Sequence, residues 1–257
     1  MKPDSNSDSP IVVREFCVAE ECPAIPQLLP SEVHTWLCGL NRDAEQIAAL
    51  QSPLSPDESH GAQRYRFDAD RNEFIITRGT LRKLLAMYLS ARPAELRFAY
   101  SSNGRPAVAG PAFGNPVDFN ISHSGGMALL AFSRGCRIGT DIERVRRDFH
   151  TGEIAGRFFS AAERAALREL PVEQRYEAFF RCWTRKEAFI KALGEGLSRP
   201  LDEFDVSLAP GAPAALLATR PNAGEATRWS LWNIAVPCEY AAALAVELPR
   251  EIQAAAV

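Results

Sequence analysis

Two carboxylates stand two positions apart in the run Gly-Thr-Asp-Ile-Glu of residues 139–143. Side chains alternate along a β-strand, so Gly139, Asp141 and Glu143 would share one face. At roughly 6 to 7 Å apart by strand geometry, the two carboxylates could share one hard divalent cation. We expect Gly139 to leave that face open. The alternative is an acidic, exposed strand face, and no ligand spacing here identifies magnesium as an EF-hand spacing identifies calcium.

A third carboxylate, Glu187, falls inside an apolar helical pattern over residues 173–193. At 100° per residue it lies within about 40° of Phe180 and Trp183 on the helix surface. Burying an ionised carboxylate costs on the order of several kcal/mol unless a cation compensates it, which indicates a partner for this acid. Lys191 follows one turn later on nearly the same side. The two residues could equally form an ordinary i, i+4 ion pair at the rim of the stripe.

A histidine stands at the end of another strand pattern. His123 follows Asn-Ile-Ser and precedes Ser-Gly-Gly, so we expect it in a tight turn where hydrogen-bond donors converge on an anion. A loop histidine is more often an ordinary surface residue.

The composition excludes several classes of protein. The 257 residues carry a net charge of −3, which argues against a nucleic-acid partner, and 46% are hydrophobic, as in an ordinary globular protein. Arginine and lysine nevertheless cluster at residues 64–83 and 144–147, which would commonly form solvated helix faces. No run approaches the ~20 apolar residues of a membrane span. The polar N-terminus is unlike a secretory signal.

The six cysteines contain no Cys-x-x-Cys pair, so neither a zinc site nor a redox motif is indicated. Free thiols and the absence of a signal pattern favour a cytoplasmic location with no membrane partner.

The sequence pattern also predicts the elements that would position these side chains. A capping box of Ser160 and Glu163 starts one helix, and the turn Ser102-Asn103-Gly104 would hold Arg105 in a fixed direction. We expect helices at residues 74–90, 161–170 and 173–193, an edge strand at 11–17 after a polar leader, a strand-turn-strand over 97–108, an antiparallel meander of 117–122, 127–133 and 136–145, and a terminal hairpin of 229–236 and 240–246.

This order of elements lacks the regular βαβ alternation of a parallel doubly wound sheet. We therefore expect an α+β protein of two similar α/β halves, although no internal repeat in the sequence proves that the halves are related.

Taken together, these segments resemble the Sfp-type 4′-phosphopantetheinyl transferases over roughly residues 60 to 210. WTRKEAFIK at 183–191 is similar to the family's Trp-x-x-Lys-Glu-x-x-x-Lys helix, and IGTDIE at 138–143 to its Gly-x-Asp-x-Glu strand. FNISHS at 119–124, GRP at 104–106, RYRF at 64–67 and GLSRPLDEFDVSL at 196–208 follow the family's order. The chain departs from the pattern at Arg105, where the family often has Lys, and at Thr184, where it often has Ser or Cys.

The resemblance implies a fold and an activity. The fold would be an intramolecular pseudo-dimer with an N-terminal half at 1–135 and a C-terminal half at 136–257, working as a monomer. The activity would be the magnesium-dependent transfer of the 4′-phosphopantetheine arm of coenzyme A to a serine of an acidic acyl or peptidyl carrier protein.

The resemblance also implies roles for individual residues. Mg²⁺ would be bound by Asp141, Glu143 and Glu187, with Glu187 and Lys191 as the catalytic pair. Coenzyme A would be bound by Arg64, Arg105, Pro106, Ser122, His123 and Lys191.

Two other functions remain open at this point. A non-catalytic module of the same fold would bind carriers or coenzyme A, but its expected mark, the loss of an acid or the lysine, is missing here. A magnesium phosphohydrolase would use the same acids, yet no phosphate-cradling glycine motif occurs.

Overall fold

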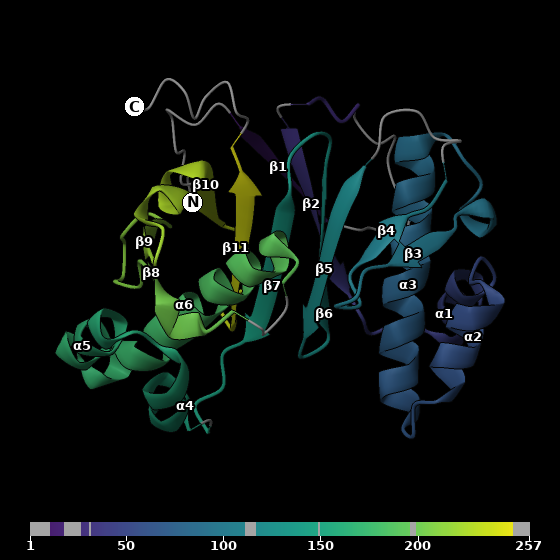
Figure 1. The fold of residues 1–257 in the computed structure, drawn as a ribbon. Helices are drawn as coiled ribbons and strands as arrows, with labels where there is room; N and C mark the ends of the chain where they lie inside the picture. Colours follow the sequence, from purple (N-terminus) through teal and green to yellow (C-terminus); the bar gives the residue numbers. More distant parts are fainter. Residues whose placement is uncertain are drawn as a thin grey trace.

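The computed structural model describes residues 11–17, 27–30, 32–110, 117–148, 150–195 and 199–248. Helices form two flanks with the main β-strands between them (Figure 1). The polar leader of residues 1–10 and the first residues of the 196–208 motif lie outside the described part of the chain. None of the described helices combines the length and apolarity needed to span a bilayer.

A four-stranded sheet comes from the N-terminal part of the chain, in the order β1-β2-β6-β5. β1 pairs in parallel with β2 at the edge of this sheet, which confirms the predicted edge strand, and the other pairs are antiparallel. The strands are β1 (Val12–Cys17), β2 (Glu32–Gly39), β5 (Asp118–Ser124) and β6 (Met127–Ser133).

A three-stranded sheet, in the order β10-β11-β7, comes from the C-terminal part. Its strands are β7 (Ile138–Arg144), β10 (Trp229–Asn233) and β11 (Tyr240–Glu247), and the last two form the expected terminal hairpin. The predicted meander is wrong in its third strand, because β7 pairs with β11 and not with β6. Both edges of β6 are already paired, with β2 and β5, so the chain turns at Gly135 (φ +82°) into the second sheet.

Two small hairpins also lie within the described residues. β3 (Phe98–Tyr100) and β4 (Pro106–Val108) confirm the predicted strand-turn-strand, with Gly104 at φ +77° in its turn. β8 (Phe204–Val206) pairs with β9 (Leu216–Thr219).

The N-terminal flank contains, among the residues that the structure describes, the α-helices α1 (Ala44–Gln51), α2 (Pro56–Gln63) and α3 (Asp68–Leu89). The prediction placed the start of the long helix at residue 74, whereas α3 begins at Asp68. Asp68 and Asp70 in the first turn favour this earlier start, because acids stabilise a helix N-terminus. The first two helices were not predicted, although both begin at capping boxes.

In the described part of the C-terminal flank lie the α-helices α4 (Thr151–Phe158), α5 (Ala161–Glu169) and α6 (Val172–Leu193). The last two confirm the predicted helices, and α4 was not predicted. α6 was expected to bury one apolar stripe, but it is buried on nearly all sides from Ala178 to Leu193. Phe179 and Phe189 lie in the core, while Trp183 and Glu187 of the predicted stripe are only partly buried. The helix therefore packs between other elements and does not lie on a surface.

The two sheets meet along β5 and β7, and we call this boundary the seam. Side chains of β5 bond to backbone N–H groups of β7: Asp118 to Ile138 and Asn120 to Thr140. Arg144 N–H in turn donates to Ser124 Oγ at 3.2 Å. The partners stay twenty residues apart, so the strands run side by side in parallel, held by side chains and not by a backbone ladder.

The buried apolar residues of the described part form three clusters, one in each flank and one between the two sheets. The central cluster takes residues from both sheets, among them Val33, Leu129, Ile142 and Leu244. The α+β fold class is thus confirmed. The family's two-part division at residue 135 stays a prediction, although each main sheet draws its strands from one side of that position.

Candidate active site

The seam brings a lysine and a carboxylate from distant parts of the chain together. Lys191 Nζ of α6 lies 2.6 Å from Asp141 Oδ1 of β7 and 3.0 Å from Ser122 Oγ of β5. Ser122 also donates to Asp141 Oδ1 at 2.7 Å. The Asp141 side chain is 4% exposed and that of Lys191 is 29% exposed. The partly exposed ammonium group therefore lies between the buried Asp141 carboxylate and solvent.

The second strand acid is held in the same way by the next hydroxyl of β5. Ser124 Oγ donates to Glu143 Oε2 at 2.7 Å and accepts the Arg144 N–H. Burial raises the pKa of Glu143, and the hydrogen bond from Ser124 opposes that rise. β5 thus supplies one hydroxyl to each of the two acids.

Gly139 does not leave its strand face open, as we had expected. A Cβ at this position would lie 2.2 Å from the carbonyl oxygen of Ala188 and 2.2 Å from the backbone nitrogen of Ala192. The backbone of α6 therefore packs directly on β7, and the missing side chain is what permits this approach. Close packing brings Glu187 and Lys191 to the strand that carries the acids.

Glu187 joins this group through its electrostatics. Burial first, and then the negative charges of Asp141 and Glu143, raise the pKa of Glu187 to about 7, while Lys191 opposes the rise. Burial likewise raises the pKa of Asp141, against the pull of the Lys191 ammonium. Three carboxylates that repel one another in a partly buried place would bind a cation or a proton.

The donor chemistry of this site fits a hard divalent cation. Asp141 Oδ2 is buried and accepts no hydrogen bond, although a buried carboxylate oxygen normally has a partner. Within the described ranges, no three His, Cys, Asp or Glu side chains lie close enough to hold a metal as they stand. The Lys191 ammonium already occupies the Oδ1 side of Asp141, which leaves Oδ2 as the oxygen for an added cation.

A cavity of about 380 Å³ opens beside these groups. Its wall comes from α3, the β3–β4 turn, β5 and the end of α6, so both parts of the chain contribute. The lining residues are Tyr65, Phe74, Thr77, Arg78, Asn103, Gly104, Arg105, Pro106, Phe119, Asn120, Ile121, His123, Lys191 and Gly194.

The structure places the sequence-predicted residues unequally around this cavity. Arg105, Pro106, His123 and Lys191 line it, and Ser122 is bonded to Lys191. Arg64 is exposed and does not line the cavity, although the next residue, Tyr65, does.

His123 was expected in a tight turn and instead lies within β5, one residue before the strand ends. The turn itself consists of Gly125 and Gly126, both at positive φ. The strand fixes the face of the sheet on which His123 lies. Its Nδ1 lies 4.0 Å from Glu73 Oε2, and its side chain is 55% exposed.

Two further residues of the cavity were missed as site residues. Arg78 Nη1 and Thr77 Oγ1 are buried, and neither has a hydrogen-bond partner. Both lie on the face of α3 that lines the cavity. Arg78 belongs to the arginine cluster for which the sequence predicts a solvated helix face, and the cavity that α3 and β5 line together distinguishes it from its neighbours.

The motif lysine that precedes Glu187 has a different place. Lys186 Nζ is fully buried and lies 2.8 Å from Glu163 Oε1. At 100° per residue it points away from Lys191, which bonds Asp141. It also donates to the carbonyl oxygens of Leu201 and Phe204. Lys186 therefore belongs to the core of the C-terminal flank.

Comparison with known proteins covers both parts of the chain. Residues 137–245 match the family model of the 4′-phosphopantetheinyl transferase superfamily. Residues 41–134 match the model of the 4′-phosphopantetheinyl transferase N-terminal region.

Curated relatives carry the same name. The chain is 37% identical to the 4′-phosphopantetheinyl transferase HetI of Nostoc sp., over 85% of this chain and 89% of that protein. It is 34% identical to a putative 4′-phosphopantetheinyl transferase of Synechocystis sp., over 76% and 77%. It is 32% identical to the 4′-phosphopantetheinyl transferase Sfp of Bacillus subtilis, over 64% and 70%.

Proposed function

This chain belongs to the 4′-phosphopantetheinyl transferase superfamily and is a phosphopantetheinyl transferase of the Sfp type, and we propose how its residues carry out the transfer. The substrates in this proposal are coenzyme A and an apo acyl or peptidyl carrier protein. One observation carries it: the Lys191 ammonium bonds a buried aspartate whose second oxygen has no partner, beside a glutamate with a pKa of about 7.

Coenzyme A would bind in the 380 Å³ cavity with its phosphates toward the cationic groups of the wall. Arg78 offers a buried N–H and Thr77 a buried hydroxyl, both without partners, so an anion there would satisfy groups that are otherwise costly to bury. His123 faces the same cavity from β5. The part of Arg64 in binding stays a prediction.

Asp141, Glu143 and Glu187 would hold Mg²⁺, with the unpartnered Asp141 Oδ2 as the first ligand. When bound, the ion would neutralise charge on the pyrophosphate of coenzyme A. Ser122 and Ser124 orient the two strand acids for this role, since each donates a 2.7 Å hydrogen bond to one of them.

In the reaction, the carrier serine oxygen attacks the phosphorus attached to the pantetheine arm. The bond from that phosphorus to the bridging oxygen of the pyrophosphate breaks, and adenosine 3′,5′-bisphosphate leaves. Lys191 stabilises the charge that develops on the leaving oxygen. Glu187, a carboxylate beside the proposed metal site, would accept the serine proton.

Intact-mass spectrometry of an apo carrier protein tests the proposal. The carrier is incubated with the enzyme, coenzyme A and Mg²⁺, and the controls are EDTA and a carrier whose acceptor serine is alanine. A gain of one phosphopantetheine that requires both metal and serine is the expected result. No gain with fatty acid, polyketide or peptide carriers would favour a binding module, and breakdown of coenzyme A without a carrier would favour a phosphohydrolase.

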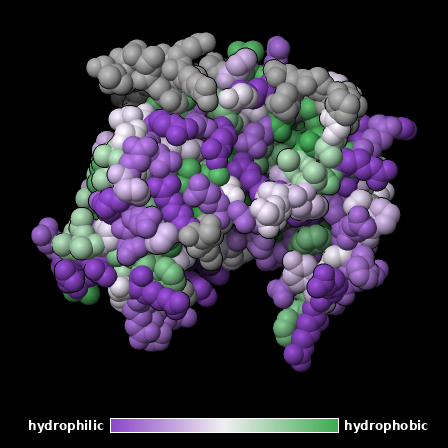
Figure 2. Space-filling view, in the orientation of Figure 1, coloured by the Kyte–Doolittle hydropathy of each residue, from purple (hydrophilic) through white to green (hydrophobic). Residues whose placement is uncertain are grey.

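The setting of the reaction is also part of the proposal. The five described cysteines are free thiols, which supports a reducing, cytoplasmic location. The net charge of −3 supports a function without nucleic acid. Hydrophilic residues dominate the face seen in Figure 2, with hydrophobic residues in small separate patches, which suits a monomer that meets carriers without a membrane.

A further inference from the structure

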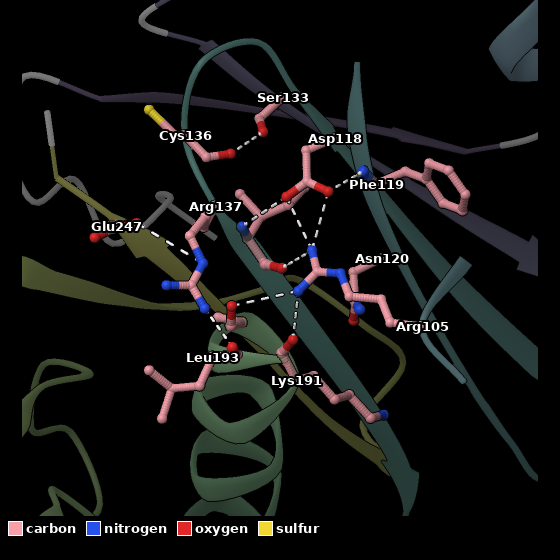
Figure 3. Close-up of polar contacts among 12 residues, drawn as sticks. Arg105, Asp118, Phe119, Asn120, Ser133, Cys136, Arg137, Lys191, Leu193 and Glu247 are labelled. Atoms are coloured by element: carbon pink, nitrogen blue, oxygen red, sulfur yellow. Dashed lines mark hydrogen bonds and ion pairs between the residues drawn. The ribbon is translucent and has the colours of Figure 1, made fainter. Parts of the chain in front are cut away.

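The last turn of α6, which carries Lys191, is tied down from outside the helix. A helix leaves its last carbonyl groups without intrahelical partners, and here side chains bond to four of them in succession. Arg105 Nη1 donates to the carbonyl oxygens of Lys191 at 2.6 Å and Ala192 at 3.3 Å. Arg137 donates to that of Leu193, and Asn103 to that of Gly194. The close-up in Figure 3 shows both arginines reaching the end of this helix.

Arg105 differs from Arg137 in the groups that it bonds at the seam. Its Nη2 donates to both carboxylate oxygens of Asp118, at 3.0 and 2.9 Å, and to the carbonyl oxygen of Ile138 at 3.0 Å. One guanidinium therefore links the end of α6, the start of β5 and the start of β7. Arg137 is held instead by Glu247 of its own sheet (Figure 3).

These bonds decide what else Arg105 can do. A guanidinium has five N–H donors, and the four on Nη1 and Nη2 already serve protein oxygens. The Arg105 side chain is only 19% exposed. To bind a phosphate through both of its terminal nitrogens, it would have to release Asp118 and the helix carbonyls, which would leave partly buried acceptors without donors.

We propose that Arg105 is a positioning residue, which holds the last turn of α6 against the seam so that Lys191 Nζ stays on Asp141. The link is direct, because Arg105 bonds the backbone carbonyl of the same residue whose ammonium bonds Asp141. Asp118 orients Arg105 and so shares this role. The inference replaces the expectation that Arg105 chiefly binds coenzyme A, and it rests on the proposed transfer reaction.

Asp118 allows a decisive experiment, because it bonds Arg105 without lining the cavity of the site. In Asp118→Asn an amide N–H₂ group replaces one of the two carboxylate oxygens that accept from Arg105, and it faces the N–H donor of Phe119 or Ile138. The charged, two-oxygen link to Arg105 is therefore lost without any contact to coenzyme A. We expect Asp118→Asn and Arg105→Ala to lower kcat by about 10- to 100-fold, the effect of misplacing a catalytic group by about 1 Å. KM for coenzyme A should change by less than about twofold.

Arg137→Ala is the matched control. It removes the cap of the neighbouring carbonyl but no bond to Lys191, so it should lower the melting temperature and leave kcat within about twofold. A tenfold rise in KM for coenzyme A in Arg105→Ala, with kcat retained and Asp118→Asn unaffected, would overturn the proposal. So would an equal loss of kcat in Arg137→Ala, which would indicate general loosening of the helix. Wild-type turnover in the same assay tests the transfer reaction separately.

Discussion

The helix α6 carries two lysines, each paired with a carboxylate, and the two pairs differ in how completely they are satisfied. Lys186 and Glu163 are at most 2% exposed and lie 2.8 Å apart. Around them, two carbonyl groups accept from Lys186, and the N–H groups of Ser160 and Val206 donate to Glu163. Lys191 and Asp141 lie 2.6 Å apart, yet Lys191 is partly open to solvent and Asp141 Oδ2 has no partner.

The difference shows how one motif serves two purposes. A buried pair with every polar atom bonded is costly to break and offers nothing to a ligand, so it serves the fold. A pair with an unused oxygen and an open side can accept a new charge, so it serves chemistry. Lys186 and Lys191 are five residues apart in the sequence, and only their surroundings separate the two roles.

Breaking the fully bonded pair of Lys186 and Glu163, the closed pair, should give the largest effect. Lys186→Met leaves Glu163 charged and buried, and we expect a loss of about 3–5 kcal/mol in the free energy of unfolding, measured by urea denaturation. Lys83→Met, at an exposed position of α3, should stay within about 0.5 kcal/mol. If the two variants lost equal stability, the closed pair would have no special structural role.

Breaking the partly exposed pair of Lys191 and Asp141 should lower the rate of transfer instead. Lys191→Met removes the charge that meets the leaving group, and we expect transfer to slow by about 10²- to 10³-fold. The stability loss should stay below about 2 kcal/mol, because Asp141 still accepts from Ser122 and can take up a proton. Initial rates and urea unfolding on one preparation measure both quantities. A variant that transfers normally would remove Lys191 from the mechanism.

Glu187 sharpens the comparison through pH. Burial and the neighbouring carboxylates raise its pKa to about 7 in the folded protein, above its ordinary value of 4.5, so the folded state binds more protons between these values. The free energy of unfolding therefore falls as pH rises through this window, by at most about 3 kcal/mol. Glu187→Gln removes this penalty.

We therefore expect the Glu187→Gln variant to be more stable than the wild type at pH 8 but not at pH 4, and to be inactive. Thermal unfolding at both pH values in metal-free buffer measures the difference. Equal stability of the two proteins at pH 8 would show that ionised Glu187 does not destabilise the folded protein.

The smallest effect concerns the support of Glu143. Ser124→Ala removes one hydrogen bond to its carboxylate, worth about 1 kcal/mol, which corresponds to roughly a fivefold higher Mg²⁺ requirement. A titration of activity against Mg²⁺ measures this, with the exposed Ser52→Ala as control. An unchanged requirement would show that Ser124 does not support a metal ligand.

Much of the site could be predicted from the sequence because local patterns encode it. Alternation put Asp141 and Glu143 on one strand face, and helical spacing put Glu187 and Lys191 on one side of a helix. The pairing of β7 with β11 could not be predicted this way, since it depends on both edges of β6 being occupied by distant strands. Long-range partners of that kind leave no periodic trace in the chain.

Other features were missed for the same reason. In the sequence Arg78 resembles the other arginines of its cluster, and only the fold shows that it lines a cavity together with residues of β5. Gly139 was read as an opening, whereas its missing Cβ lets the backbone of α6 approach to a distance that no side chain would allow. The capping boxes at Asp43 and Ser55, by contrast, were visible in the sequence and could have located α1 and α2.

The seam has a consequence for how the gene can vary. Along β5 the even positions 118, 120, 122 and 124 bond across to β7 or to its acids, while Phe119 and Ile121 pack in the core of the N-terminal flank. In a library of single substitutions over this strand, the two sets of positions would therefore give different results. Even positions would tolerate only small polar residues, and a loss there would cost turnover. Positions 119 and 121 would tolerate apolar exchanges, and a loss there would cost the yield of folded protein, whereas the odd position 123 faces the cavity, so a loss there would act on coenzyme A binding.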